Sequence, residues 1–424
     1  MKSHGLRPAL GLSALCLYAI GMILGAGIYS ILGKAAGVAG HALWLSFAVG
    51  GVAATLTGLS YAELATTFPS AGAEYVYVRQ AAPGRRWVAT LVGILLALAG
   101  AATATTVTLA FAGYLQQFIA APEPLVAVAL LLALTAINVV GITASSRINA
   151  IFTVIEVGGL LVVIALGMTR PEFGRSALRD VDLNILPAAA LVFFAFLGFE
   201  EIANLAEEAR DPSRDVPRAI LIGVAVSTTL YILVALSATS LLAPADLAAS
   251  ASPLADAAGS VSSGLAGVLS AVALFATANT GLIALVATSR LVFAMARGGD
   301  LPPVLARTLA KRGSPWIAGL ATFAVAAALL PLGSIELVAG LSSFAALIAF
   351  SAVNTSVIVL RYRMPDVRRP FRVPLSIGRL PIVPALGLVA TAVLLTQFGR
   401  DVYLAGAIAV AIGVAVGRLR GLWD

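Results

Sequence analysis

Two short stretches containing glycine interrupt long apolar segments of this sequence. The first is residues 21–28 (GMILGAGI), and the second is residues 193–201 (FFAFLGFEE). Glycine weakens a helix, and an unwound backbone inside a membrane is tolerated only where its polar groups line a cavity or bind something. N–H groups at the start of a half-helix suit a carboxylate, whereas freed carbonyls suit an ammonium group or a cation. The two stretches therefore predict a site for an amino acid or an amine.

The placement of the two stretches matters more than either one alone. A single glycine cluster in a membrane helix is also typical of close packing between helices. Here one interrupted segment opens the first five apolar spans and the other opens the next five. Interruptions at corresponding places in two halves indicate a transporter built from an inverted repeat with discontinuous helices.

Glu156 is the deepest acidic residue of the apolar segments. It lies nine residues past Arg147, about 13 Å into its span at ~1.5 Å per residue. Asn149 and Thr153 share its helix face, and an ionisable group at this depth is a functional candidate by default. We expect it to load and release a proton, or to bind Na⁺ with Thr288 or Ser289. The alternative is a neutral carboxyl group bonded to a backbone carbonyl.

Other polar residues accompany these two candidates. Glu200 follows the second interruption, where it is either a second coupling residue or a hinge that bonds the freed backbone. Glu201, Glu207 and Glu208 lie nearer the cytoplasmic end and, with neighbouring arginines, are expected to form an ion-pair network or inner gate. The span near 264–295 carries a polar stripe with Thr277, Thr280 and Thr288 in line and with Asn279 and Ser289 beside it.

The elements that position these residues are membrane helices. Hydrophobic residues make up 60% of the 424 residues and charged residues 11%, against ~45–50% and ~25% in a soluble domain. This composition excludes a soluble enzyme, a disordered chain and a secreted disulfide scaffold, and the single cysteine excludes an intrachain disulfide. The net charge of +7 lies in short clusters between apolar runs, which does not favour nucleic-acid binding.

The sequence divides into twelve apolar spans in a single domain. A helix needs ~20 apolar residues to cross a bilayer, and each span meets this requirement approximately. We predict spans near 11–34, 41–66, 87–113, 123–143, 147–168, 186–206, 217–242, 264–295, 315–332, 335–360, 380–398 and 401–418, with a short outer surface helix within 245–262.

The distribution of lysine and arginine predicts the orientation. With the N-terminus inside, 22 of these residues lie in inner segments and 5 in outer segments, as the positive-inside rule requires. We expect a multi-pass protein of the plasma (inner) membrane, with both termini in the cytoplasm, acting as a monomer or a weak homo-oligomer. No spacing is typical of a metal site, a nucleotide-binding loop or a catalytic triad, so we expect no enzyme activity, no metal and no cofactor.

The sequence resembles permeases of the amino acid–polyamine–organocation (APC) superfamily over nearly its whole length. Gly25-Ala26-Gly27-Ile28 resembles the G-[ST]-G-I motif of their first helix. Four other stretches are similar in the same order: residues 60–75 after the second helix, 196–220 at the sixth helix, 289–302 at the eighth, and 369–374 before the eleventh.

This resemblance implies the all-α fold of the leucine transporter. Helices 1 and 6 would be discontinuous, and alternating access would take place around a central site. The five-plus-five inverted repeat would comprise residues 11–168 and 186–360, followed by two accessory helices within 380–418. Transport would be driven by H⁺ or Na⁺ or would run as exchange. A polyamine or cationic-amine transporter and a transporter-like substrate sensor are the alternatives within this fold.

The resemblance also implies roles for individual residues. The substrate carboxylate would meet the backbone of Gly25, Ala26 and Gly27, although Ala26 lacks the hydroxyl that the family often has there. Relatives that couple to protons often place a lysine at about the position of Glu156. Because glutamate carries the opposite charge, the lysine mechanism cannot apply unchanged. The amino group would meet carbonyls beside the breaks, and an aromatic side chain of helix six would cap the site. The carbonyls would belong to residues around Ile23, Phe194, Ala195 and Leu197. Gly198 would lie at the second break itself, and Phe199 or Phe194 would be the aromatic cap.

Overall fold

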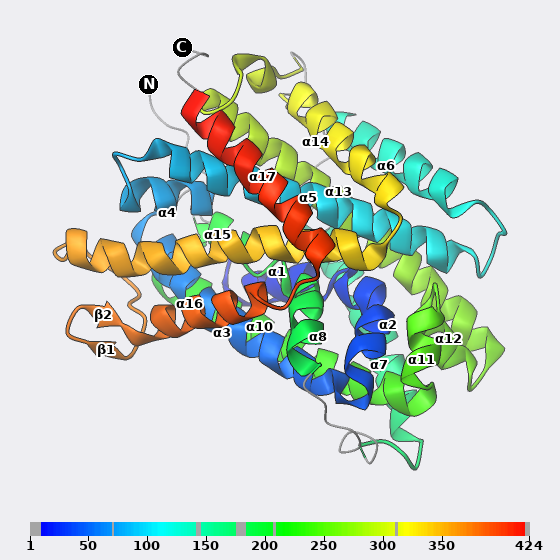
Figure 1. The fold of residues 1–424 in the computed structure, drawn as a ribbon. Coiled ribbons are helices and arrows are strands. Elements are labelled where there is room, and N and C mark those ends of the chain that lie inside the picture. The colour runs from blue at the N-terminus through cyan, green and yellow to red at the C-terminus, as the bar shows by residue number, and fades with distance from the viewer. Residues whose placement is uncertain are drawn as a thin grey trace.

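Helices account for nearly all of the regular structure of this chain (Figure 1). The computed structural model describes residues 10–69, 72–140, 146–174, 184–206, 209–309 and 313–419, without the side chains of 146–150. Asn149, Glu207 and Glu208 therefore lie outside the described side chains. The main helices are α1 (Leu12–Leu24), α2 (Gly27–Ala39), α3 (Leu43–Thr67), α4 (Ala73–Ala81), α5 (Arg86–Leu115), α6 (Glu123–Val140), α7 (Ser146–Met168), α8 (Ile185–Val192), α9 (Glu201–Asn204), α10 (Pro212–Leu241), α11 (Pro244–Ala249), α12 (Pro253–Gly259), α13 (Ser263–Arg297), α14 (Trp316–Leu329), α15 (Ile335–Arg363), α16 (Ile382–Leu395) and α17 (Arg400–Leu419).

The helices have the length and composition of a polytopic membrane protein. Nine segments of the described chain are long and apolar enough to cross a bilayer, with Gly27–Thr67 counted as one. Three shorter apolar helices accompany them: α1, α16 and the segment Trp316–Leu332. A 13-residue helix such as α1 is only ~20 Å long and cannot span alone. The prediction of an all-helical, multi-pass protein is thus confirmed.

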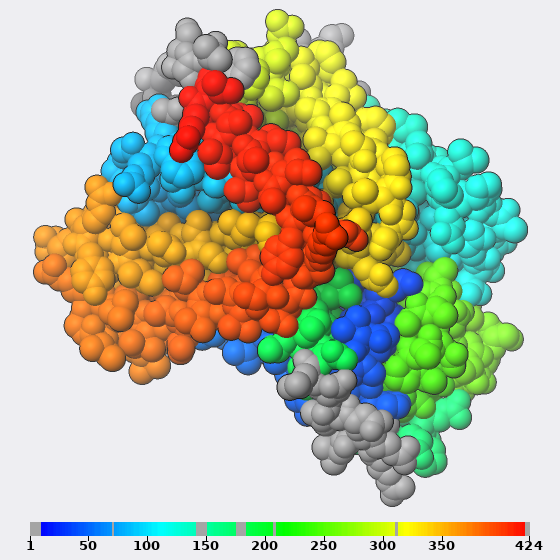
Figure 2. Space-filling model, viewed as in Figure 1, coloured from blue at the N-terminus to red at the C-terminus, as the bar shows by residue number. Residues whose placement is uncertain are grey.

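Helix α5 lies in the middle of the bundle. It packs against α13, α15 and α17, while α10 packs against α3 and α1. In Figure 1, α4 and the small hairpin of β1 (Ser376–Ile377) and β2 (Leu380–Pro381) lie at one end, and α11 and α12 lie at the other. The space-filling view shows the hairpin region, in orange, as the edge of the molecule at its end of the bundle (Figure 2).

Two of the predicted elements have different limits in the structure. Helix α10 begins at Pro212, five residues before the predicted span, because proline fits the first turn of a helix. The predicted surface helix within 245–262 is two helices, α11 and α12, since Pro253 starts the second. Both pack inward through Leu247 and Leu254, which are fully buried.

Candidate substrate site at two helix breaks

The first helix break lies between α1 and α2. Helix α1 ends at Leu24 and α2 begins at Gly27, as the sequence predicts. Within the break, the Ala26 N–H donates to the Thr280 hydroxyl of α13 at 2.8 Å. Ala26 has no side-chain hydroxyl of its own, and Thr280 supplies one from another helix. A side chain from a distant helix therefore satisfies a backbone donor of the break.

The second break follows α8. A 3₁₀ turn covers Phe193–Phe196, and regular helix resumes at Glu201. Gly198 has φ of +123°, a conformation that is accessible mainly to glycine. Its N–H donates to Glu200 Oε2 at 2.8 Å. This contact corresponds to the hinge role that the sequence allows for Glu200.

The two breaks touch each other. A Cβ atom built on Gly27 would lie 2.5 Å from Ala195 Cα, and one built on Gly198 would lie 2.5 Å from the Met22 carbonyl oxygen. Distances this short exclude a side chain at either glycine unless the backbones separate. Glycine thus lets two polar, irregular backbone segments meet inside the bundle.

Tyr231 of α10 joins the carbonyls of the two breaks. Its hydroxyl lies 2.5 Å from the Ile23 oxygen and 2.8 Å from the Ala195 oxygen, and the residue is fully buried. A hydroxyl has one proton to donate, so it satisfies only one of these carbonyls fully at a time. Sequence reasoning missed Tyr231, whose only signal was a phenol in the middle of an apolar span.

Aromatic rings surround the second break. The Phe199 ring lies 5.7 Å from Tyr61 and 5.2 Å from Phe350, measured between centroids. Phe196 lies 5.3 Å from Tyr231. Phe194 is 3% exposed, and Leu197 is partly buried against the core. An apolar group next to the breaks would therefore meet mainly aromatic and aliphatic surface.

Glu156 lies close to the first break, on α7. Its side chain is 1% exposed and hydrogen-bonds to the side chain of Asn279, while its Oε1 has no partner within the described part of the chain. Asn279 directly precedes Thr280, so one turn of α13 contacts both Glu156 and the first break. The Tyr29 hydroxyl of α2 also donates to the Glu156 backbone oxygen at 3.1 Å.

Thr288 and Ser289 lie away from Glu156 along α13. They are eight or nine residues beyond Thr280, which is ~12–14 Å on a helix. The Thr288 hydroxyl lies against Gly100 of α5, and Ser289 accepts a hydrogen bond from Asn138 at 3.2 Å. The structure thus pairs Glu156 with Asn279 and does not bring it together with Thr288 or Ser289.

Comparison with known proteins identifies the family. The model of the amino acid permease family matches residues 10–414, which is nearly the whole chain. The chain belongs to the amino acid permease family. The resemblance to the APC superfamily is therefore confirmed.

Three relatives align with this permease over most of their length. The branched-chain amino acid permease BcaP of Bacillus subtilis is 29% identical over 418 residues, which cover 93% of this chain and 89% of the relative. An uncharacterized transporter of Mycobacterium tuberculosis is 34% identical over 421 residues, with 98% and 92% covered. The methylthioribose transporter of Bacillus subtilis is 30% identical over 412 residues, with 91% and 87% covered. All three are named as permeases or transporters rather than enzymes.

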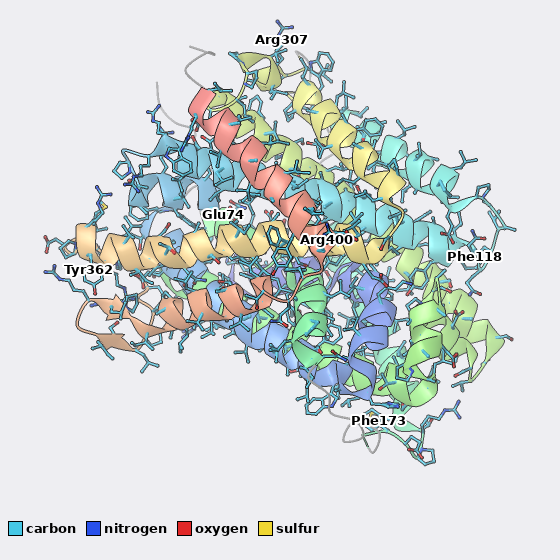
Figure 3. All side chains as sticks on the ribbon, viewed as in Figure 1. Glu74, Phe118, Phe173, Arg307, Tyr362 and Arg400 are labelled. Atoms are coloured by element: carbon cyan, nitrogen blue, oxygen red, sulfur yellow. The ribbon has the colours of Figure 1, made fainter. Side chains whose placement is uncertain are left out.

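Polar contacts of this permease also surround α9. Asn204 donates to Glu201 at 3.0 Å and accepts from the backbone N–H groups of Gly72 and Ala73. Glu74 of α4 accepts from the Tyr61 hydroxyl at 2.9 Å. Burial, reinforced by the nearby Glu201, raises the pKa of Glu74 to about 7. The arrangement links α4 to the second break through hydrogen bonds, and Figure 3 shows Glu74 in the half of the molecule opposite Phe118.

Proposed function

We propose that this permease is a secondary transporter that moves amino acids across the membrane by alternating access. The contact between the two helix breaks supports this proposal most strongly. It places backbone donors of Ala26 and Gly27 beside the carbonyls of Ile23 and Ala195, so one small region offers partners for both ends of an amino acid. A fully buried region of this kind must open to each side in turn for a substrate to pass.

Each predicted substrate-binding residue has a place in this proposal. The substrate carboxylate replaces the Thr280 hydroxyl at the first break, and the ammonium group replaces the Tyr231 hydroxyl at the carbonyls. Both exchanges trade a neutral hydrogen bond for a charge-assisted one, which is roughly twice as strong. The carboxylate binds Gly25, Ala26 and Gly27; the ammonium binds carbonyls among Ile23, Phe194, Ala195 and Leu197; Gly198 forms the turn, and Phe199 caps the site.

A neutral, apolar side chain fits the surroundings of the site best. Phe194, Phe196 and Phe199 lie at the second break, and all three are buried. The relative BcaP is named as a branched-chain amino acid permease, which agrees with this preference. We therefore expect leucine, isoleucine or valine as substrates.

One observation favours a cationic amino acid or amine as the second candidate. Glu74, Glu200 and Glu201 are close enough to influence one another electrostatically. Three neighbouring carboxyl groups beside the second break would attract a substrate with a basic side chain. A transporter-like sensor is the other alternative, since it would use the same site for binding alone.

Counterflow into liposomes tests the proposed function. Liposomes containing the purified chain and loaded with unlabelled leucine are expected to take up labelled leucine transiently, because exchange needs no gradient. Unlabelled valine outside should compete, and lysine should compete at least ~10-fold less, since a charge in apolar surroundings is costly. The reverse order would establish the cationic alternative. Binding of amino acids without any uptake would make the protein a sensor.

Membrane architecture forms the second part of the proposal. We propose twelve membrane spans, arranged as the repeats 11–168 and 186–360 followed by two accessory helices within 380–418. The lysine and arginine distribution supports an orientation with both termini in the cytoplasm. We propose that the protein is a monomer or weak homo-oligomer of the plasma membrane. Coupling would use H⁺ or Na⁺, with Glu156 as the main candidate and Glu200 as the second.

Cysteine labelling in intact cells tests this orientation. Gly84 and Gly399 are exposed and have no atoms near an added Cβ, so Gly84→Cys and Gly399→Cys should fold normally in a Cys16→Ser background. An impermeant maleimide is expected to label the cysteine at 399 in intact cells. The cysteine at 84 should react only after the membrane is permeabilised. The opposite pattern would invert the topology.

A further inference from the structure

A strongly basic cavity lies beside the end of α15, away from the helix breaks. Its volume is about 350 Å³, and it is bounded by the last turn of α15, the segment that follows it and the β1–β2 hairpin. Four of its six lining residues are arginines and none is acidic. The lining residues are Arg361, Pro365, Val367, Arg369, Arg372 and Arg379.

Two of these arginines hold the fold together. Arg361 binds Glu63 of α3 through two hydrogen bonds of 3.0 and 2.5 Å, and Arg369 pairs with the same carboxylate at 3.3 Å. Arg369 also donates to the backbone oxygens of Val367 and Met364 at 3.0 Å each. Their charges are thus partly balanced by one carboxylate beneath the cavity.

The other two arginines of the cavity are not paired with a carboxylate in the described part of the chain. Arg372 and Arg379 are exposed, and neither has a hydrogen-bond or ion-pair partner within the described part of the chain. Burial lowers the pKa of Arg369, and the nearby Arg361 and Arg372 guanidinium groups add to this effect while Glu63 opposes it. Four guanidinium groups therefore face one carboxylate, and the cavity carries excess positive charge.

Apolar side chains are exposed next to these arginines. Leu375 is 70% exposed and Ile377 74% exposed on the hairpin, and Tyr362 is 50% exposed at the end of α15. Figure 3 shows Tyr362 at this extremity of the molecule. Aliphatic and tyrosine side chains beside arginines are typical of a surface that lies at the membrane interface. Such a surface would place the cavity at the depth of the lipid headgroups.

We propose that this cavity binds the phosphate of an anionic phospholipid headgroup, with Arg372 and Arg379 as its principal donors. Guanidinium groups bind phosphate oxygens through paired hydrogen bonds. The distribution of basic residues assigns this end of the bundle to the cytoplasm, where membrane leaflets carry anionic lipid. The exposed Leu375 and Ile377 favour a lipid over free phosphate, because only a lipid brings acyl chains to cover them.

Lipid binding to the purified full-length chain tests this proposal. Native mass spectrometry in detergent would compare phosphatidylglycerol with phosphatidylcholine of the same acyl chains. We expect the wild-type chain to bind phosphatidylglycerol at least ~10-fold more tightly, and Arg372→Gln/Arg379→Gln to weaken that binding roughly thirtyfold, with phosphatidylcholine unaffected. The melting temperature without added lipid should stay the same, since neither arginine has a partner to lose.

Two controls make the result decisive. Arg85→Gln/Arg86→Gln removes the same charge from exposed positions outside the cavity, and it should change phosphatidylglycerol binding less than ~3-fold. Inorganic phosphate at millimolar concentration should not displace the lipid. Wild-type binding in Arg372→Gln/Arg379→Gln, or equal losses in both double variants, would overturn the cavity as the site. Phosphate binding to the cavity without phosphatidylglycerol binding would overturn the lipid as its ligand.

Discussion

Gly27→Leu is expected to abolish substrate binding and transport while the protein stays folded. A Cβ atom at this position would lie 2.5 Å from Ala195 Cα, so leucine must force the two helix breaks apart. The substrate would then lose hydrogen bonds to its carboxylate or its ammonium group, each worth ~1.5–3 kcal/mol. The loss of two such bonds weakens binding at least ~100-fold. Isothermal titration with leucine and counterflow on the same preparation would measure both effects.

Gly158→Leu is the matched control for this substitution. Gly158 also lies in a membrane helix, but it is exposed and no atom lies within 4 Å of an added Cβ. We expect wild-type affinity and transport from this variant. Gly27→Ala, which adds only the Cβ, should give an intermediate loss. An unchanged leucine affinity in Gly27→Leu would show that the substrate does not bind at the breaks.

Glu156→Gln is expected to uncouple transport from the gradient. Glutamine imitates the neutral carboxyl group in nearly the same volume, but it cannot release a proton or neutralise a cation. A carrier that moves one proton with each substrate accumulates it ~10-fold per unit of pH difference. We expect this ratio to fall to about one in the variant, whereas counterflow of leucine without a gradient should persist. Uptake into liposomes with an imposed pH or Na⁺ gradient would measure the accumulation ratio.

A distant carboxylate provides the control for Glu156→Gln. Glu123 is exposed at the start of α6, so Glu123→Gln should accumulate leucine as the wild-type chain does. If Glu156→Gln also accumulates leucine normally, Glu156 is a structural residue bonded to Asn279, and Glu200→Gln becomes the next variant to measure. A lower melting temperature as the sole effect would support the same structural role.

The helix breaks could be predicted from the sequence because their cause is local. Gly25 and Gly27 interrupt the first span, and Gly198 adopts a backbone conformation that suits glycine. The multi-pass helical class follows from composition, which also needs no knowledge of neighbours. These features depend on the residues themselves and on the solvent around them.

The partners of the breaks could not be predicted, because they come from distant parts of the chain. Tyr231 and Thr280 reach the breaks from α10 and α13, and nothing in the sequence around either residue predicts that contact. The polar stripe of α13 could be predicted from its spacing. Which turn of the stripe faces Glu156 depends on how α13 packs, and the structure selects Asn279 rather than Thr288 or Ser289.

Two tyrosines tie the half-helix α2 to its neighbours. The Tyr29 hydroxyl donates to the Glu156 backbone oxygen of α7, and the Tyr29 backbone oxygen accepts from the Tyr114 hydroxyl of α5 at 3.1 Å. If α2 tilts away from α7 or α5, it must release a buried hydrogen bond, which costs ~1–3 kcal/mol. One such bond makes the tilted arrangement roughly 5- to 150-fold rarer. Tyr29 therefore fixes α2 to both neighbours, and the contact of its hydroxyl depends directly on the local position of α7 at Glu156.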